Sequence, residues 1–332
     1  MTRWSASRLV LTLLASALLW SVLAAACVTV GSTGEIGWPA NRELLRIRLD
    51  AVLVASLVGA ALAAAGVVYQ AILQNALADP YLLGVSSGAT LFAYLWQLPA
   101  FTAGMVIGEQ GFAFAGALSA VAIVFLLASR RGRLEPITML LVGVIVNAVN
   151  SSIFLLLNTI VKDPARPGGP LALLVGGLQT NLTLASSEVR VAAMVISLGW
   201  LVLFAMSGQL NVALLSESEA TGLGVRIHRL RWAAMIVASL ITASAVAISG
   251  PIGFIGLVCP HLARLIVGND QRRIIPLSTA LGAALLALAD AASRRLSTFG
   301  SVETVLPVGV LTGLLGGPFF LLLLWKRTHR RA

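Results

Sequence analysis

The chain has 332 residues, of which 58% are hydrophobic and only 11% are charged, and it carries a net charge of +10. A soluble domain typically has about 25% charged residues, so this composition excludes a water-soluble enzyme and also a disordered chain. Because the charges lie between long apolar runs, the excess of basic residues indicates membrane topology and no nucleic-acid partner. The sequence therefore predicts an all-α polytopic membrane protein.

About ten transmembrane helices are predicted, since a spanning helix needs about 20 mostly apolar residues. In chain order the candidate spans are Leu9–Val30, Ala51–Leu73, Leu83–Leu98, Phe112–Ser129, Ile137–Ile160, Val191–Met206, Trp232–Ser249, Ile252–Val267, Pro276–Ala289 and Val305–Trp325. The first run could also be a lipoprotein signal peptide ending at Cys27, but it continues past that cysteine. Between the fifth and sixth spans, Pro170–Leu184 is too short and polar to cross, and we expect a helix lying at the interface. The prediction is a single transmembrane domain over residues 1–332.

The charged residues set the orientation through the positive-inside rule. With the N-terminus inside and ten spans, fifteen basic and five acidic residues fall inside, and eight of each fall outside. Nine or eleven spans would put the two ends of the chain on opposite sides and lose this segregation. We therefore expect both termini in the cytoplasm.

The longest inside loop comprises about residues 207–231. Within it, Ser216 precedes the acidic residues Glu217 and Glu219, and Gly222 and Gly224 follow them. This order predicts a short capped helix terminated by glycine. Such a helix is either a docking surface for a soluble partner or an ordinary solvated connector.

Two spans have informative faces. In the second, Gly59, Ala63 and Gly66 form a small-residue face that predicts close helix packing. In the fifth, polar residues recur at helical spacing and form a stripe, which favours either a water-filled path for a large polar solute or hydrogen bonding between helices. The stripe consists of Asn147, Asn150, Ser151, Phe154 and Asn158.

Motifs for chemistry carried out by the chain itself are weak. Lys162 and Lys326 are the only lysines, and neither lies in a Gly-x-x-x-x-Gly-Lys-[Ser/Thr] motif, so no P-loop for ATP is expected. The acidic residues fall at span ends or in loops, which argues against a proton relay. Gly84-Val85-Ser86-Ser87-Gly88 matches the nucleophile-elbow pattern, but a tight glycine turn that opens a helix is the favoured interpretation. The cysteines and histidines form no metal-ligand pattern.

At this point three groups of residues identify a family resemblance. They are Gln74–Pro80 with Leu83–Gly88, Gly250–Leu257 with Pro260–Arg264, and Pro307–Phe320. The chain resembles, over nearly its whole length, the permease subunits of type II ABC importers, the group that imports cobalamin, haem and ferric siderophores. The resemblance implies that fold, a homodimer with the path between its subunits, and a location in the inner (plasma) membrane. It also implies two ATPase subunits that hold ATP and magnesium, a substrate-binding protein outside, and no cofactor or catalytic residue in this chain.

The resemblance also implies roles for particular residues. Asn75 and Leu77 match positions of the cytoplasmic gate. Residues of the inside loop match the segment that couples to the ATPase, namely Glu217, Glu219, Ala220, Leu223 and Gly224.

On the outside, Arg48 and Arg294 match basic positions that meet acids on the binding protein. The family usually has Arg-Leu-Pro-Arg before its second span, whereas this chain reads Arg48-Leu49-Asp50-Ala51, so Arg46 or Arg295 is the expected substitute for the missing arginine. The family's Asn-Pro-Leu-Ala reads Asn75-Ala76-Leu77-Ala78, which predicts a less rigid gate turn.

The expected solute is an iron chelate, a ferric siderophore or haem, with cobalamin as the alternative. Neutral amides on a path suit siderophore oxygens and haem propionates equally, and no axial-ligand histidine or methionine motif decides among them. An ion-coupled secondary transporter and an intramembrane hydrolase are the alternatives from other classes.

Overall fold

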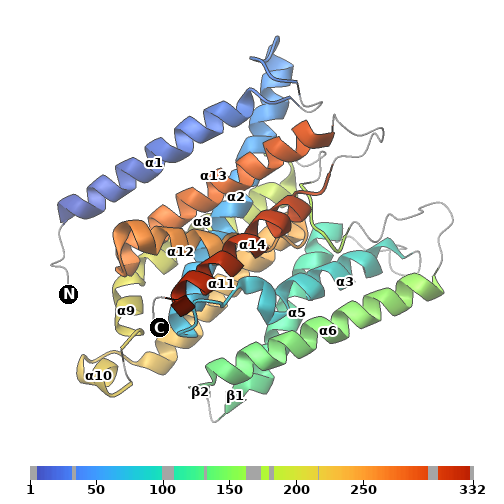
Figure 1. Cartoon of the computed structure of the whole chain (residues 1–332). Coiled ribbons are helices and arrows are strands. Elements are labelled where there is room, and N and C mark those ends of the chain that lie inside the picture. Colours follow the sequence, from blue (N-terminus) through green and yellow to red (C-terminus); the bar gives the residue numbers. More distant parts are fainter. Residues whose placement is uncertain are drawn as a thin grey trace.

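The computed structural model of the chain is a bundle of helices whose long members run roughly side by side (Figure 1). It describes residues 6–31, 35–98, 108–130, 133–161, 173–178, 183–215, 217–297 and 306–329. Within these described ranges, seven helices are long and apolar enough to cross a membrane. They are α1 (Ala6–Val28), α2 (Arg42–Ile72), α5 (Glu109–Ala128), α6 (Pro136–Ile160), α8 (Ser187–Ala205), α11 (Ile227–Ser249) and α13 (Gln271–Ser297).

The three remaining predicted spans also fall on helices, and the all-α polytopic prediction is confirmed. These helices are α3 (Val85–Gln97), α12 (Ile255–Val267) and α14 (Val308–His329). Shorter elements complete the described chain: η1 (Pro80–Leu83), α9 (Ser207–Val212), α10 (Glu217–Gly222) and the two-residue strands β1 (Ser129–Arg130) and β2 (Arg133–Leu134), which pair antiparallel.

The centre of the bundle is formed by α2 and α13, which are mostly buried, whereas α1, α6 and α8 are mostly exposed. The predicted small-residue face of α2 brings the backbones together here. A Cβ atom on Gly59 would lie 2.1 Å from the carbonyl oxygen of Gly282, and one on Gly66 would lie 2.0 Å from that of Gly256. Without side chains at these positions α2 lies directly on α13 and α12, and the exposed outer helices are left for lipid or another subunit.

Polar side chains add specific links between the central helices. The hydroxyl groups of Tyr69 on α2 and Ser239 on α11 are 2.9 Å apart. The Gln70 amide donates to the carbonyl oxygen of Gly256 at 3.1 Å and accepts a hydrogen bond from Arg264 of α12. Buried polar groups of this kind need partners in an apolar medium, so these contacts fix the register of α2 against α11 and α12.

The interface helix expected over Pro170–Leu184 is absent from the described part of that stretch. Residues 173–178 form a turn followed by irregular chain, and residues 170–172 and 179–182 lie outside the description. The Gly177 amide donates to the carbonyl oxygen of Ser249 at 2.9 Å, and the Gly309 amide donates to that of Gly176 at 3.1 Å. The segment therefore links the end of α11 to the start of α14, and the hydrogen bonds that a helix would have made internally go to these two elements.

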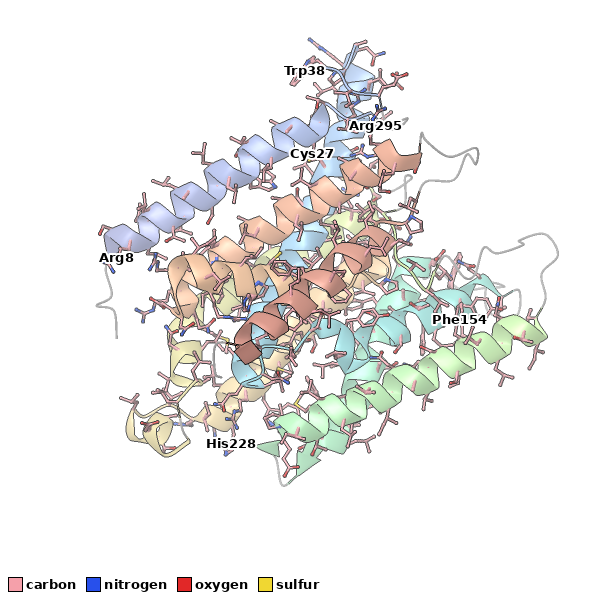
Figure 2. All side chains as sticks on the ribbon, viewed as in Figure 1. Arg8, Cys27, Trp38, Phe154, His228 and Arg295 are labelled. Atoms are coloured by element: carbon pink, nitrogen blue, oxygen red, sulfur yellow. The ribbon has the colours of Figure 1, made fainter. Side chains whose placement is uncertain are left out.

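The first and last helices share one end of the bundle with α10. In Figure 1, α1 begins and α14 ends at the end that carries α9 and α10. Figure 2 places Arg295 and Trp38 at the opposite end, away from His228 at the start of α11. An even number of crossings produces this arrangement.

Candidate functional site

The asparagines of α6 contact the turn that leads into α3. The Asn147 amide donates to the carbonyl oxygen of Tyr81 at 3.0 Å, and the Asn150 amide donates to the Oγ of Ser87 at 3.1 Å. Gly143 of α6 permits this approach, because a Cβ atom there would lie 2.3 Å from a carbonyl oxygen of η1. The polar stripe therefore does make hydrogen bonds between helices.

The same face of α6 also bounds a polar cavity of about 190 Å³. Four of the five predicted path residues line it, namely Asn147, Asn150, Ser151 and Phe154, and α3 contributes the hydroxyls of Ser86, Ser87 and Thr90. The Phe154 ring is buried against Tyr94, with ring centroids 5.0 Å apart. Asn158 lies one turn farther along α6, half-buried, and outside this lining. Neutral hydroxyls and amides are suited to hydrogen-bond a polar solute without imposing a charge.

The Gly-x-Ser-x-Gly pattern is a turn, as the favoured interpretation predicted. Gly84 has a φ of +82° and is the N-cap of α3, and a Cβ atom there would lie 2.9 Å from the side chain of Val146. Glycine is the residue that adopts this conformation at little cost. The described residues that line the cavity include Ser86 but no histidine, so Ser86 has no general base in this cavity.

A second cavity, of about 340 Å³, adjoins the first. The two share Tyr81, Leu174 and Pro251 in their linings, and the second reaches Phe254 at the start of α12 and Gly309 at the start of α14. Leu174 belongs to the segment that links α11 with α14. Sequence reasoning missed this segment because it treated the stretch as a separate helix.

Asp79 connects the loop after α2 with two helix starts. Its carboxylate accepts a hydrogen bond from the main-chain N–H of Tyr81 at 3.0 Å and another from the main chain of Phe254. Burial of the carboxyl group raises the pKa of Asp79 to about 6, against the opposing effect of these two hydrogen bonds. Phe254 has a φ of +70°, unusual for a residue with a side chain, and this bond helps to hold it there.

The predicted gate residues lie on the same loop. The Asn75 side chain accepts a hydrogen bond from the Leu77 amide at 2.9 Å, and the Leu77 side chain is 41% exposed. Gln74, which has a φ of +48°, donates its side-chain amide to the carbonyl oxygen of Ala213 at 3.1 Å. Ala213 follows α9, so the loop with the gate residues is joined directly to the inside loop, a contact that no local sequence pattern indicated.

The inside loop contains the short helix α10 that was predicted there. Its end is a Schellman motif, in which the Val225 amide donates to the carbonyl oxygen of Ala220 at 3.1 Å and the Gly224 amide to that of Thr221 at 2.9 Å. Gly224 has the required positive φ of +76°, so the prediction of a glycine-terminated helix is confirmed.

The predicted coupling residues divide between the two sides of α10. Ala220 is buried and anchors the helix on the hydrophobic core, whereas Glu219, Leu223 and Gly224 are exposed. The side chain of Glu217 lies outside the described residues. The exposed set gives α10 a surface on which a partner can contact it.

The predicted docking arginines are placed differently from the expectation. Arg48 is only 8% exposed and donates to the carbonyl oxygens of Gly37 at 2.6 Å and Val28 at 3.3 Å. Arg294 is 7% exposed and forms an ion pair with Asp290 at 2.9 Å. A buried guanidinium needs such partners, so these two groups hold the ends of α1, α2 and α13 together and are not presented on the surface of this conformation. Arg46 and Arg295, the two expected substitutes, are both exposed, and Figure 2 places Arg295 at the same end of the bundle as Trp38.

A many-span helical bundle with a polar cavity between its helices and a short helix exposed at one end is the architecture of a membrane permease. The family model of the FecCD transport family matches residues 8–326, and the chain belongs to this family of ABC importer permeases.

Relatives that are named for the solute they transport support the family assignment. The chain is 38% identical over 301 residues to the cobalamin import system permease protein BtuC of Halobacterium salinarum. The aligned region covers 89% of this chain and 77% of the relative. It is 35% identical over 308 residues to the hemin transport system permease protein HmuU of Yersinia pestis, covering 91% and 87%. A solved metal-chelate type ABC transporter in an inward-facing conformation aligns with a TM-score of 0.81 at 28% identity, covering 96% of this chain and 99% of that one. The resemblance drawn from the sequence motifs is thereby confirmed.

Proposed function

We propose that the chain is the permease subunit of an ATP-driven importer that carries an iron chelate, a ferric siderophore or haem, from a binding protein outside the cell membrane into the cytoplasm. The observation that carries this proposal is the polar, uncharged cavity between α6 and α3. Its amides and hydroxyls can replace part of the hydration of a chelate's oxygens, and no fixed charge there would hold the solute too tightly to leave. Names of relatives point the same way, since they include hemin, iron chelatin and iron(III)-citrate permeases.

Cobalamin is the second candidate, and it is favoured by a specific observation. The relative named for cobalamin import is 38% identical, slightly more than the 35% of the one named for hemin. Both solutes are large metal chelates with many hydrogen-bonding groups, so the amides and hydroxyls of the cavity can form hydrogen bonds with either one.

Membership of the family supports a proposed assembly. The proposed transporter is a homodimer of this single transmembrane permease domain in the inner (plasma) membrane, with both termini cytoplasmic. Two ATP-binding cassette subunits supply ATP hydrolysis, and the chain itself is not an enzyme. The exposed side of α10, with Glu219 and Leu223, is the proposed ATPase dock, and Asn75 and Leu77 form the proposed cytoplasmic gate.

On the outer face, we propose that an exposed basic residue meets the binding protein. Arg295 is exposed and takes the direct role, whereas Arg48 and Arg294 support the surface from below through their buried contacts.

Uptake by reconstituted protein tests the proposal. The chain and its co-purified ATPase subunits are placed in liposomes, and uptake of labelled haem, a ferric siderophore and cobalamin is measured, each with its binding protein. ATP-dependent uptake of haem or the siderophore supports the iron-chelate proposal, and uptake of cobalamin alone supports the second candidate. Uptake that continues without ATP and stops when an ion gradient is collapsed would overturn both.

A matched pair of variants connects transport to the cavity. Asn150→Leu removes an amide that lines the cavity, and Asn158→Leu changes the same residue type on the same helix outside the lining. We expect uptake to fall at least fivefold in the first variant and less than twofold in the second. Equal effects would separate the transport path from this cavity.

A further inference from the structure

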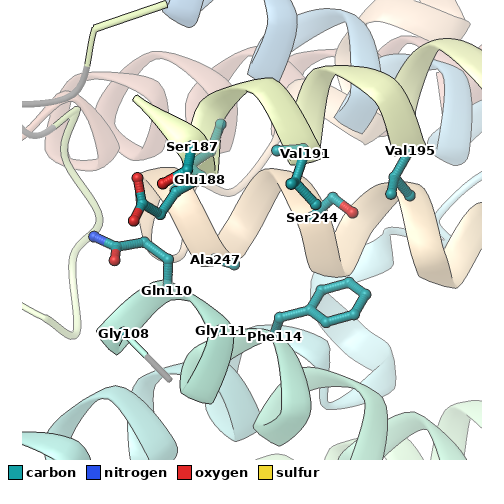
Figure 3. A pocket seen from close by; sticks show the side chains of 12 residues that line it. Gly108, Gln110, Gly111, Phe114, Ser187, Glu188, Val191, Val195, Ser244 and Ala247 are labelled. Atoms are coloured by element: carbon teal, nitrogen blue, oxygen red, sulfur yellow. The ribbon is translucent and has the colours of Figure 1, made fainter. Parts of the chain in front are cut away.

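A third hollow, of about 310 Å³, lies between α5, α8 and α11, away from the two cavities described above. Figure 3 shows its two ends. Glu188 and Gln110 lie together at one end, and Phe114 and Val195 lie at the other. Most of the surface that lines it is apolar. The hollow therefore has a polar mouth and an apolar interior.

The polar mouth lies at a membrane surface. Helix α5 begins at Glu109, α8 begins at Ser187, and α11 ends at Ser249. These helix ends meet at the face of the bundle opposite α10, because α11 starts beside α10 and crosses to its other end. The interior of the hollow therefore extends from the headgroup level toward the hydrocarbon core, which is the orientation of a bilayer lipid.

The hollow is open to the surrounding bilayer. Val191 on its rim is 61% exposed, and α8 is one of the mostly exposed outer helices. Inside, the Ser244 hydroxyl already donates to the carbonyl oxygen of Leu240 at 2.9 Å and so needs no partner from an occupant. The hollow therefore suits an apolar acyl chain, which can enter through the side that faces the membrane and needs no hydrogen bond from the interior.

The volume corresponds to a segment of an acyl chain. A water molecule takes about 30 Å³ in the liquid, and a methylene group is of similar size. The hollow therefore has room for about ten chain carbons, which is more than half of a common membrane acyl chain.

The mouth carries one carboxylate available to an occupant. Glu109 accepts a hydrogen bond from Gln97 at 3.3 Å, whereas Glu188 has neither a hydrogen bond nor an ion pair with any residue in the described part of the chain. A half-buried carboxylate beside apolar surface is stabilised by a cationic donor. We propose that this hollow binds a bilayer phospholipid with a primary-amine headgroup, of the phosphatidylethanolamine type, with its ammonium at Glu188 and one acyl chain between α5, α8 and α11.

The headgroup chemistry makes the proposal selective. A primary ammonium donates hydrogen bonds to the Glu188 carboxylate and pairs with its charge. A phosphatidylcholine headgroup has the charge but no N–H donor, and phosphatidylglycerol brings a negative charge that the carboxylate repels.

Native mass spectrometry of the purified full chain, with equal amounts of the three lipids carrying identical acyl chains, tests the proposal. We expect the wild-type protein to retain phosphatidylethanolamine at least fivefold more than either other lipid. Ala247→Phe, which fills the hollow from α11, should reduce retention of phosphatidylethanolamine at least fivefold. Glu188→Gln should keep lipid bound but reduce the preference for the amine headgroup to less than twofold.

Controls separate the site from general lipid contact and from misfolding. Met194→Phe adds the same ring to an exposed position of α8 outside the lining, and Glu43→Gln removes an exposed carboxylate at the same membrane face, so both should bind as the wild type does. Val191→Phe obstructs the opening from an exposed position. If Ala247→Phe fails to fold, the retention of phosphatidylethanolamine by Val191→Phe tests the proposal in its place. Equal retention of the three lipids by the wild type, or undiminished retention in the folded variants that fill or obstruct the hollow, would overturn the proposal.

Discussion

Replacement of Asp79 separates two things that this side chain does, accepting hydrogen bonds and carrying a charge. The carboxylate is buried and accepts main-chain hydrogen bonds from Tyr81, in the first turn of η1, and from Phe254, the N-cap of α12. Asp79→Asn keeps one carbonyl oxygen, so the hydrogen bond from Tyr81 can persist without the charge. Asp79→Ala removes the acceptor and leaves the two N–H groups unsatisfied.

The magnitude follows from the pKa of Asp79. Burial raises it from 3.8 to about 6, which is a difference of roughly 2 pH units and corresponds to about 3 kcal/mol at most. The folded protein binds the proton more tightly than the unfolded chain, so the stability contributed by this group is greatest below about pH 4. It then falls as the pH rises to about 6 and stays constant above that. Asp79→Asn has no such dependence.

Thermal unfolding in detergent, followed for the three proteins between pH 4 and 8, measures these effects. We expect the advantage of Asp79→Asn over the wild type to grow as the pH rises from 4 to 6, and then to level off. Asp79→Ala should be about 1–3 kcal/mol less stable than Asp79→Asn at every pH, because each lost cap bond leaves a buried donor unpaired. The reasoning is refuted if Asp79→Asn is as unstable as Asp79→Ala, or if its difference from the wild type does not change with pH.

Three further substitutions test the packing, the dock and the gate. Gly66→Val should destabilise the fold by more than about 3 kcal/mol and lower its unfolding temperature, because even a Cβ atom there would lie 2.0 Å from the carbonyl oxygen of Gly256. Gly224→Ala should cost about 1 kcal/mol at its positive φ and weaken co-purification of the ATPase, whereas Gly222→Ala, which meets no atom within 4 Å, should not weaken it. Leu77→Ala should raise solute leakage without ATP in proteoliposomes, and unchanged leakage would remove this side chain from the gate.

Much of the fold could be predicted from the sequence because few backbone structures can form in a lipid bilayer. A long apolar run in lipid must satisfy its own backbone hydrogen bonds, so it forms a helix, and each predicted span falls on one. The end of α10 was also predictable, since Gly224 supplies a local conformation that other residues avoid. The stretch at residues 173–178 was not, because its partners are distant in sequence: the Gly177 amide donates to Ser249, and the Gly176 carbonyl oxygen accepts a hydrogen bond from Gly309 at the start of α14.

The candidate site was predictable in composition but not in its contacts. Helical periodicity places Asn147 and Asn150 on one face of α6, yet their partners Tyr81 and Ser87 are more than 60 residues away. The two arginines are a clearer example of contacts that the sequence does not reveal. A basic residue at the outer end of a span suits a binding protein or a set of main-chain carbonyls equally well, and only the tertiary structure shows that Arg48 has the second role.

The contacts around the loop with the proposed gate residues join it to the inside loop and to α12. The loop is held at one end by Gln74, which bonds to Ala213 beside α9, and at the other by Asp79, which bonds to the start of α12. Helix α9 is in turn fixed by Asn211, whose side chain bonds to Asp270 in the turn before α13. We propose that a displacement of the inside loop reaches the chain segment that carries Leu77 through the hydrogen bond between Gln74 and Ala213. The proposed dock on α10 and the proposed gate would then change position together, which fits an importer that works with ATPase partner subunits.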